Sequence, residues 1–271
     1  MSSSSYTTKE PILKQQFADQ GFATKPFPQE LRSSMLRHIE SHIRELGDPY
    51  FKSGNLANSS LEEIAMSIPD EVWSKKMNRA FRVFPHELAG QVHQWADKSI
   101  RKEFGRQRSA VNVVYPSEAE MNPKLTQESL AIYWRCVRPG KPDAGRAHRD
   151  ATFWVLELEE GYDPKIPFPF DYLKDCLKIW IPLKGCTPKT TLQVIPRSHK
   201  EEIPIVIEQT EYGRRPTIDG AWLQSQEKSF VSPIELSQGS CIIFDMDLVH
   251  RGPTHNNTEL RISAEISLIV Q

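Results

Sequence analysis

The stretch Gly239-Ser-Cys-Ile-Ile-Phe-Asp-Met-Asp-Leu-Val-His250 joins an apolar run to a polar end that carries an imidazole. Such a run, opened by Gly, predicts a buried strand that ends at a functional side chain. A second run follows, Leu260-Arg-Ile-Ser-Ala-Glu-Ile-Ser-Leu-Ile-Val270, in which apolar and polar residues alternate. This alternation favours a strand with one apolar face and one face turned toward polar groups.

Similar short runs, rich in β-branched and aromatic residues and separated by Pro, Gly and polar turns, extend back to Gly105. They predict strands over Val111–Tyr115, Ala131–Arg138, Thr152–Leu158, Leu177–Leu183, Leu192–Pro196, Ser229–Glu235, Ser240–Phe244 and Leu260–Val270. About eight short strands are typical of a double-sheet barrel of the jelly-roll kind.

The first hundred residues have a helical period instead. Apolar residues recur at three- and four-residue steps over Gln29–Leu46 and Glu87–Phe104, which predicts two amphipathic helices. Between them, Ser60-Leu-Glu-Glu63 has the form of a helix cap and opens a segment that Pro69 interrupts.

A chain of 271 residues is within the range of one β-barrel domain with added helices, and no long Gly/Ser/Pro linker divides it. We expect a single domain over 1–271. It would have a disordered terminus at 1–9, a mainly helical support at 10–105 packed outside the barrel, and a β-barrel core at 106–271. Helices followed by strands could also form two separate domains.

Composition limits the classes of partner. The 34 basic and 35 acidic residues nearly cancel, so bulk charge gives no reason to expect nucleic acid or an anionic membrane surface. No apolar stretch approaches the roughly 20 residues of a membrane span, and the start lacks the pattern of a signal peptide. We therefore expect a cytoplasmic monomer that acts on a small molecule. Its four cysteines, Cys136, Cys176, Cys186 and Cys241, have no C-x-x-C spacing and are expected to be reduced and mostly buried.

His148 and Asp150 stand two positions apart, immediately before a predicted strand. In an extended chain, residues two apart project to the same face, so this pair could bind one ion together. His250 supplies a second imidazole. One carboxylate and two imidazoles on one side of a metal leave its other side open, which is the arrangement with which iron(II) binds a co-substrate and oxygen.

Arg261 follows His250 by eleven positions and lies in a half-apolar strand. A buried Arg requires an anionic partner, and its planar fork suits a carboxylate. Ser263 shares its face of the strand and could add a hydroxyl.

These features together resemble the phytanoyl-CoA dioxygenase-like family of Fe(II)/2-oxoglutarate oxygenases. The resemblance rests on His148-Arg-Asp150, Lys178-Ile-Trp-Ile-Pro-Leu, Leu192-Gln-Val-Ile-Pro-Arg-Ser-His199, Gly239 to His250, Arg261-x-Ser263 and the early Gln16-Phe-Ala-Asp-Gln-Gly-Phe22. It implies a double-stranded β-helix, a cupin-like variant of the jelly roll. It also implies a reaction in which dioxygen and 2-oxoglutarate hydroxylate an unactivated C–H bond, with release of succinate and CO2.

The resemblance further implies roles for individual residues. Iron would be bound by His148, Asp150 and His250, and Arg261, assisted by Ser263, would pair with the distal carboxylate of 2-oxoglutarate. Arg135, Gln193 and Thr152 are further candidates for holding the co-substrate, and Trp180 for a wall of its pocket. The presence of Asp150 favours hydroxylation over halogenation.

The chain departs from the family's pattern at one turn. It has Pro196-Arg197-Ser198-His199 where members usually have Pro-Gly-Ser-His, and Lys189-Thr190-Thr191 where an Asn-Gly turn is expected. Gly tolerates a positive φ that Arg and Thr resist, so the geometry of this turn is open.

Basic residues around the motif give a hint about the substrate: Arg135, Arg138, Lys141, Arg146, Arg149, Arg197, Arg214, Arg215 and Arg251. If several converge on the barrel mouth, the substrate is anionic, such as a carboxylate, a phosphate or phosphonate, an acidic sugar or a CoA ester. Alternatively they form a solvated rim paired with Glu157, Glu159, Glu160 and Asp163. The long segment Glu201–Lys228 is expected to be a substrate lid or disordered.

Two other functions stay open. A cupin-like barrel could use another metal for a different reaction type, although such a barrel has no need of Arg261. A non-catalytic barrel could keep the motif as a metal-binding module, in which case iron would bind without turnover of 2-oxoglutarate.

Overall fold

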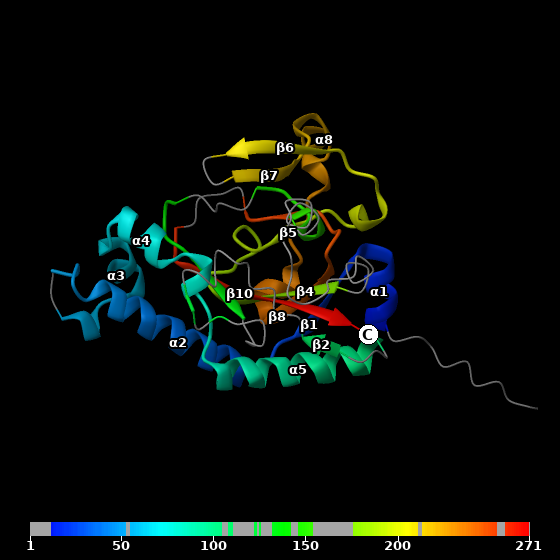
Figure 1. The fold of residues 1–271 in the computed structure, drawn as a ribbon. Helices are drawn as coiled ribbons and strands as arrows, with labels where there is room; N and C mark the ends of the chain where they lie inside the picture. The colour runs from blue at the N-terminus through cyan, green and yellow to red at the C-terminus, as the bar shows by residue number, and fades with distance from the viewer. Residues whose placement is uncertain are drawn as a thin grey trace, which may run out of the picture.

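The computed structural model describes residues 12–52, 55–104, 108–110, 122–123, 125, 132–141, 146–153, 176–210, 213–253 and 258–270. At its centre lies an antiparallel six-stranded sheet in the order β1-β8-β4-β10-β2, with β3 also paired to β10 (Figure 1). Its strands are β1 Phe22–Pro26, β2 Arg108–Ala110, β3 Tyr133–Val137, β4 Cys176–Lys184, β8 Ser240–Asp245 and β10 Arg261–Val270. Segments from both ends of the chain therefore meet in one sheet.

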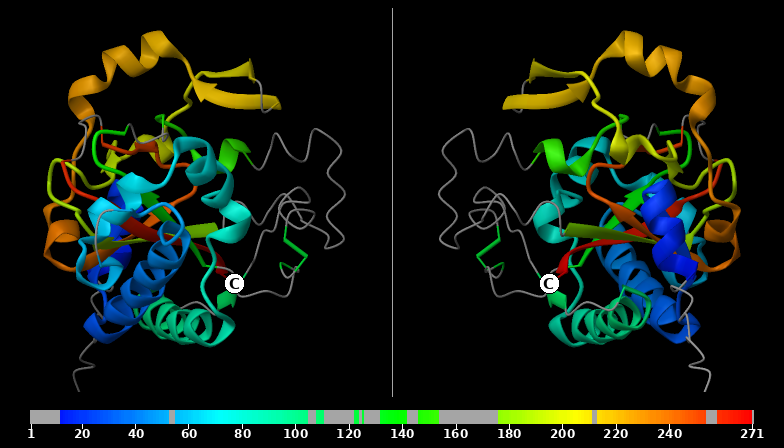
Figure 2. Two further views of the ribbon diagram at one scale, coloured as in Figure 1. Left: turned by 90° about the vertical axis from the view of Figure 1, so that its left-hand side faces the viewer. Right: turned by 90° about the vertical axis from the view of Figure 1, so that its right-hand side faces the viewer.

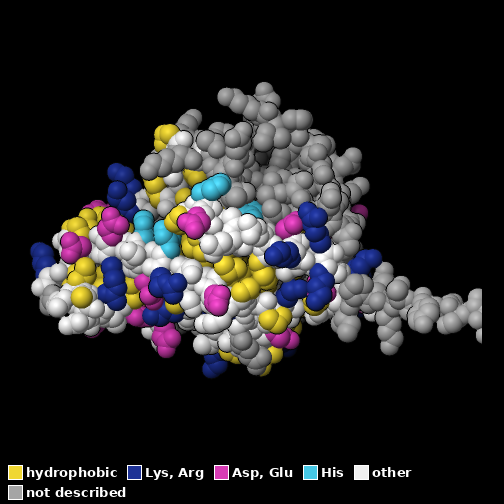
Figure 3. Space-filling model, turned by 90° about the horizontal axis from the view of Figure 1, so that it is seen from below, with side chains coloured by type: hydrophobic (Ala, Val, Ile, Leu, Met, Phe, Trp, Pro, Cys, Tyr) yellow, Lys and Arg dark blue, Asp and Glu magenta, His cyan; other side chains and the backbone are white. Residues whose placement is uncertain are grey.

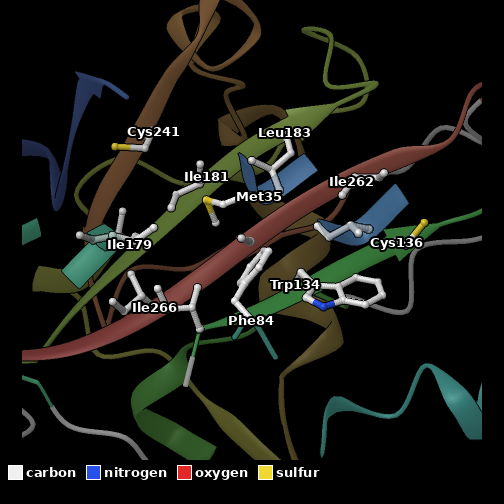
Figure 4. Close-up of a cluster of buried hydrophobic side chains, with 14 of the residues drawn as sticks. Met35, Phe84, Trp134, Cys136, Ile179, Ile181, Leu183, Cys241, Ile262 and Ile266 are labelled. Carbon is white, nitrogen blue, oxygen red and sulfur yellow. The ribbon is translucent and has the colours of Figure 1, made fainter. Parts of the chain in front are cut away.

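Helices cover one face of this sheet, where α2 and α5 run beneath it in Figure 1. The helices of the first 104 residues are α1 Ile12–Gln20, α2 Gln29–Gly47, α3 Leu61–Ser67, α4 Asp70–Lys76 and α5 His86–Phe104. The main core forms between helices and sheet, and its fully buried members include Met35, Ile39, Val92, Ala96, Ile179, Ile181, Ile262 and Ile266. Figure 4 shows Met35 and Phe84 against the sheet strands.

Strand alternation separates this core from the opposite, inner face of the sheet. Along β10, Ile262 and Ala264 belong to the helix-side core, so Arg261, Ser263 and Glu265 project to the inner face. The inner face packs on a second apolar cluster, which contains Phe22, Trp180, Leu192, Val194, Leu236, Ile242, Phe244 and Leu248. Polar residues thus enter the interior from an otherwise apolar sheet.

A second, smaller layer lies over the inner face. Its strands are β5 Gln193–Val194 and β9 His250–Arg251, and a bridge links His148 to His250. Within the described residues, hydrogen-bonded pairing does not close the two layers into a complete barrel. The predicted mainly β fold with flanking helices is confirmed, whereas full closure stays a prediction.

Four predicted strands are confirmed with small shifts at their ends, namely β3, β4, β8 and β10, and a fifth is reduced to the two residues of β5. The prediction over Ser229–Glu235 is wrong. Two 3-10 turns, Glu227–Ser229 and Ile234–Gln238, flank a single bridge at Val231. Pro233 explains the difference, because it has no N–H to donate to a ladder.

The prediction of a strand from Thr152 is also wrong, since residues 150–153 are helical. The Thr152 hydroxyl donates to the carbonyl of Arg149 at 2.7 Å, a local bond that favours a helical turn. The rest of that prediction, the strand Val111–Tyr115 and the terminus Met1–Lys9 lie outside the described residues.

The helical predictions are confirmed at α2 and α5. Ser60 and Glu63 form the expected reciprocal capping box of α3, and Pro69 separates α3 from α4. Strand β1, which continues from the turn at Gly21 and pairs with β8, was not predicted from the sequence.

The described residues of the segment Glu201–Lys228 form regular secondary structure and connecting turns. It forms a hairpin of β6 Ile205–Thr210 and β7 Gly213–Ile218, followed by α8 Gly220–Ser225. Figure 2 shows this hairpin on the far side of the molecule from α5. Its role as a lid stays a prediction.

The helix-covered face carries no single dominant charge. Figure 3 shows basic and acidic side chains interspersed there. No helix in the described part of the chain is long and apolar enough to cross a membrane.

Candidate metal centre

Two histidines far apart in the sequence are joined through their backbones. The amide of His148 donates to the carbonyl of His250 at 3.0 Å, and the amide of His250 donates to the carbonyl of His148 at 3.1 Å. This isolated antiparallel bridge places the two imidazole centroids 4.3 Å apart. The backbone, rather than side-chain packing alone, therefore sets the relative position of the rings.

The tautomer of both rings follows from their hydrogen bonds. His148 Nδ1 lies 2.6 Å from the carbonyl of Arg146, and His250 Nδ1 lies 3.0 Å from that of Leu248. A carbonyl can only accept, so each Nδ1 carries the proton and each Nε2 keeps its lone pair. Fixing the remote ring nitrogen in this way is the usual support for a metal-binding histidine.

Asp150 completes the cluster. Its Oδ1 lies 3.7 Å from His148 Nε2, and its Oδ2 lies 3.7 Å from His250 Nε2. One ligand atom from each of the three residues lies within 4.8 Å of the other two. Three atoms that all offer lone pairs thus converge, which fits a divalent cation.

The protonation states also fit a cation. Burial alone would raise the pKa of Asp150, but Lys178, His250 and His148 together hold it well below its usual range. Burial and the neighbouring His148 lower the pKa of His250 to about 4. A carboxylate with neutral imidazoles is the form that binds metal without releasing a proton. The buried Asp150 Oδ2 accepts no hydrogen bond from the described residues, and with Lys178 Nζ 3.3 Å away it still has lone pairs to offer a metal ion.

The local structure differs from the expected strand. Because Asp150 begins a helical turn, the chain bends after His148 and turns the carboxylate back toward both rings. The amide of Ala151 donates to the carbonyl of Met246 at 3.0 Å and anchors this turn beside the strand that leads to His250. The predicted convergence of three ligands is present, but the turn and not strand alternation produces it.

Arg261 and Ser263 are both buried, each with 2 % of its surface exposed. Burial, with the neighbouring Arg135, lowers the pKa of Arg261 to about 9. Its Nη1 donates to the carbonyl of Thr190 at 3.5 Å. A guanidinium so placed is suited to a carboxylate ligand, because an anion would compensate the cost of its burial.

Four further residues, Arg135, Gln193, Thr152 and Trp180, were predicted to hold or enclose the co-substrate, and only two of them lie on the inner face. Arg135 lies opposite Ser263 in the ladder, and Trp180 packs in the inner cluster with Phe244, whose ring centroid is 4.8 Å from that of His250. These two are on the inner face, as the predicted roles require.

Gln193 and Thr152 are engaged elsewhere. The Gln193 side-chain oxygen accepts from Arg251 Nε at 2.8 Å, and the Thr152 hydroxyl donates to its own turn. These contacts stabilise the β5–β9 pair and the helical turn at Thr152, and none of them indicates a role in binding the co-substrate.

Sequence reasoning missed Lys178 as a site residue. Its side chain is buried, and its Nζ lies 3.3 Å from Asp150 Oδ2 and 3.8 Å from Glu265 Oε2. The available signal was the same as for Arg261, a single cation within an apolar strand. β4 reads Cys-Leu-Lys-Ile-Trp-Ile-Pro-Leu-Lys, and Lys178 is its only charged residue before the last position.

Most of the basic residues that suggested an anionic substrate have acidic or carbonyl partners. Arg138 and Lys141 pair with Asp70, Arg149 donates to the carbonyls of Ser198 and Glu201, Arg146 pairs with Glu208, and Arg251 with Glu227. The acidic partners proposed from the sequence, Glu157, Glu159, Glu160 and Asp163, lie outside the described residues. The basic residues that suggested an anionic substrate therefore do not all converge on the metal centre.

A cavity of about 420 Å³ lies beside β3. Arg82, Arg135, Arg138 and Lys141 are among its lining residues, and the three metal-binding residues are not. Arg135 is thus shared between the inner face and this cavity.

Arg197 has a left-handed backbone, with φ +70°, and is the only non-Gly residue with positive φ among those described. Its amide donates to the carbonyl of Gln20 at 2.8 Å, which ties this turn to the end of α1. The turn thus keeps the conformation that a Gly would favour, although the chain has Arg there.

Fold and site define the class: a metalloprotein whose two histidines and one carboxylate leave one side of an ion open, on a two-layered β scaffold with helices on one face. The family model for phytanoyl-CoA dioxygenase (PhyH) matches residues 68–263, and the chain belongs to this family. It is therefore a 2-oxoglutarate-dependent non-haem iron oxygenase, with iron and 2-oxoglutarate as its cofactors.

The chain is similar to several solved structures with which it shares little sequence. A non-heme monooxygenase, ThoJ in its apo form, is 15 % identical with a TM-score of 0.51, over 95 % of this chain and 77 % of that one. EctD from S. alaskensis with 2-oxoglutarate and 5-hydroxyectoine is 16 % identical with a TM-score of 0.49, over 98 % and 79 %. The carbocyclase SnoK from nogalamycin biosynthesis is 12 % identical with a TM-score of 0.49, over 95 % and 83 %. No curated protein matches the chain.

Proposed function

We propose that this oxygenase hydroxylates an unactivated C–H bond of a small anionic metabolite. In this reaction, the substrate C–H bond, dioxygen and 2-oxoglutarate are converted to a C–OH group, succinate and CO2. The observation that carries the proposal is the convergence of His148 Nε2, Asp150 and His250 Nε2 at the inner face that also bears Arg261.

Each residue has a distinct role in this proposal. His148, Asp150 and His250 would hold iron(II), which supplies the oxidising chemistry when bound. Arg261 would bind the distal carboxylate of 2-oxoglutarate, with Ser263 as a hydroxyl donor beside it on β10. Trp180 and Phe244 would exclude water from the inner face, because both belong to its apolar cluster.

The charges of the inner face support an anionic substrate. Among the described residues, Lys178, Arg135 and Arg261 are its cations, and Asp150 and Glu265 are their acidic neighbours. Iron(II) adds two positive charges and 2-oxoglutarate adds two negative charges. Among these described groups alone, one positive charge is in excess, which favours an anion beside them. An anionic group on the substrate would be such an anion.

The β6–β7 hairpin would form one side of the substrate site. The Arg215 guanidinium lies 5.8 Å from the centroid of the Phe153 ring, which is itself 5.4 Å from the centroid of the His148 ring. A cation on the hairpin is therefore linked to a metal ligand through one aromatic ring. This arrangement suits a lid that contacts an anionic substrate.

The test is an anaerobic titration of iron(II) and then 2-oxoglutarate into the purified protein, followed through the visible charge-transfer band of the chelated complex. We expect the band to form in the wild type. In Arg261→Ala the 2-oxoglutarate concentration needed for the band should rise about tenfold or more, with iron binding nearly unchanged. Arg101→Ala is the control, because Arg101 pairs with Asp97 on the surface of α5.

A different result would separate the rival functions. Iron binding without a band would favour a cupin-like enzyme of another reaction type or a non-catalytic metal-binding barrel. Equal loss of iron and 2-oxoglutarate in Arg261→Ala would contradict the role of Arg261. If the band forms and depends on Arg261, succinate release should next be screened with pairs of compounds. The two members of a pair differ only in that a carboxylate or phosphate of one is a neutral ester in the other.

A further inference from the structure

Lys178 occupies a costly position on the inner face. It lies in the middle of the sheet, registered with Phe244 of β8 on one side and Ser267 of β10 on the other. Only 7 % of its surface is exposed. Lysine is rarely buried to this extent, so the groups that face its ammonium indicate its role.

The contacts of Lys178 place its charge beside the metal ligands. Its ammonium is 3.3 Å from Asp150 Oδ2, and its charge contributes to the lowered pKa of His250. A second carboxylate, Glu265 Oε2, lies 3.8 Å away. The ammonium is thus in contact with the atoms that would surround the ion.

A cation at this position opposes binding of a metal ion, because like charges a few ångströms apart repel strongly inside a protein. The same cation favours binding of an anion next to the metal. When a metal shares Asp150, the Lys178 ammonium stays beside the metal, with the Glu265 carboxylate at the longer distance of 3.8 Å. Its positive charge then attracts an anionic ligand of the metal.

We propose that Lys178 is an anion-binding residue of the metal centre, which attracts a carboxylate or phosphate group to the open side of the metal. This inference rests on the proposed function and extends it to a residue with no assigned role. The anion has two possible sources, the co-substrate 2-oxoglutarate and the acidic group of the substrate. Both present the same chemistry to an ammonium.

The test compares Lys178→Met, which keeps length and removes charge, with Lys178→Arg, which keeps the charge. Lys184→Met is the matched control, since Lys184 lies on the same strand and pairs with Glu62 at 3.1 Å on the helix side. Each protein is titrated anaerobically with iron(II), then with 2-oxoglutarate, and the resulting complex is titrated with inorganic phosphate. Isothermal titration calorimetry measures each binding step, and the charge-transfer band shows that 2-oxoglutarate chelates the metal.

We expect Lys178→Met to bind iron(II) as tightly as the wild type or more tightly, because a repelling charge has been removed. It should bind at least one of the two anions about tenfold more weakly, and Lys178→Arg should recover most of that loss. Weakened 2-oxoglutarate binding identifies the co-substrate as the source. A change confined to phosphate identifies the substrate group.

The proposal is wrong if neither 2-oxoglutarate nor phosphate distinguishes Lys178→Met from the wild type, or if Lys184→Met shows the same loss. It is equally wrong if iron(II) and 2-oxoglutarate weaken together, because that is the pattern of a purely structural residue. Absence of the iron and 2-oxoglutarate complex in the wild type would instead overturn the proposed function. The two failures are therefore distinguishable.

Discussion

Gly185 packs directly against the backbone of Leu260. A Cβ at Gly185 would lie 2.3 Å from the Leu260 carbonyl oxygen and 3.2 Å from Arg261 Cα, and Gly185 itself has φ +66°. The end of β4 and the start of β10 can therefore approach this closely only because residue 185 has no side chain. This contact helps to set the position of Arg261 in the sheet.

Gly185→Ala should destabilise the protein by roughly 3 kcal/mol, because left-handed strain adds to a backbone collision. It should also weaken 2-oxoglutarate binding through a shift of Arg261. Gly140→Ala is the control, since Gly140 has φ +68° but a Cβ there would meet nothing within 4 Å. That variant should lose only about 1 kcal/mol in a denaturant titration and keep 2-oxoglutarate binding. Equal losses in both would contradict the role of the contact.

Metal removal should lower the melting temperature of the wild type. A metal present at about 100 times its Kd stabilises the native state by about 2.7 kcal/mol, and EDTA would abolish that contribution. His148→Ala should melt at the same temperature with and without iron(II), whereas exposed His86→Ala should respond like the wild type. An iron-dependent shift that survives in His148→Ala would place the metal elsewhere. Differential scanning fluorimetry under anaerobic conditions measures this.

Arg197→Gly should stabilise the protein by about 0.5–1 kcal/mol, because relief of the strained positive φ of Arg197 exceeds the added chain entropy of Gly in the unfolded state. Arg197→Ala retains a Cβ and should give no such gain. Urea unfolding of the three proteins checks the order of stability, and a gain in the Ala variant would show that the Arg side chain, and not its backbone, is the source of strain.

Stability should fall as the pH rises above about 9. Burial raises the pKa of the Cys136 and Cys241 thiols to about 12, against 9.0 for an exposed thiol. Between these values the unfolded chain releases protons that the folded protein keeps, so the free energy of unfolding decreases with rising pH. Each thiol should contribute roughly 1 kcal/mol of loss at about pH 10. Cys241→Ala should have a shallower slope between about pH 8 and pH 10, and an unchanged slope would contradict this cause.

The main elements and the chemistry of the site could be predicted from the amino-acid sequence. Period and capping are local properties, so α2, α5 and the box at Ser60 were predictable, as was the alternating strand β10. The residue types His148, Asp150 and His250 were also identifiable, because few combinations of side chains bind a metal and leave it open.

How these residues meet depends on the tertiary structure. The His148–His250 bridge joins segments about a hundred positions apart, and no local pattern encodes such a pairing. Strands such as β1 were missed because their stability comes from the partner strand and not from their own composition. Lys178 was overlooked for the same reason: its proximity to Asp150 depends on a strand and a turn that touch only in the folded chain. Burial determines how strongly a charged side chain interacts with its neighbours, and burial exists only in the folded state.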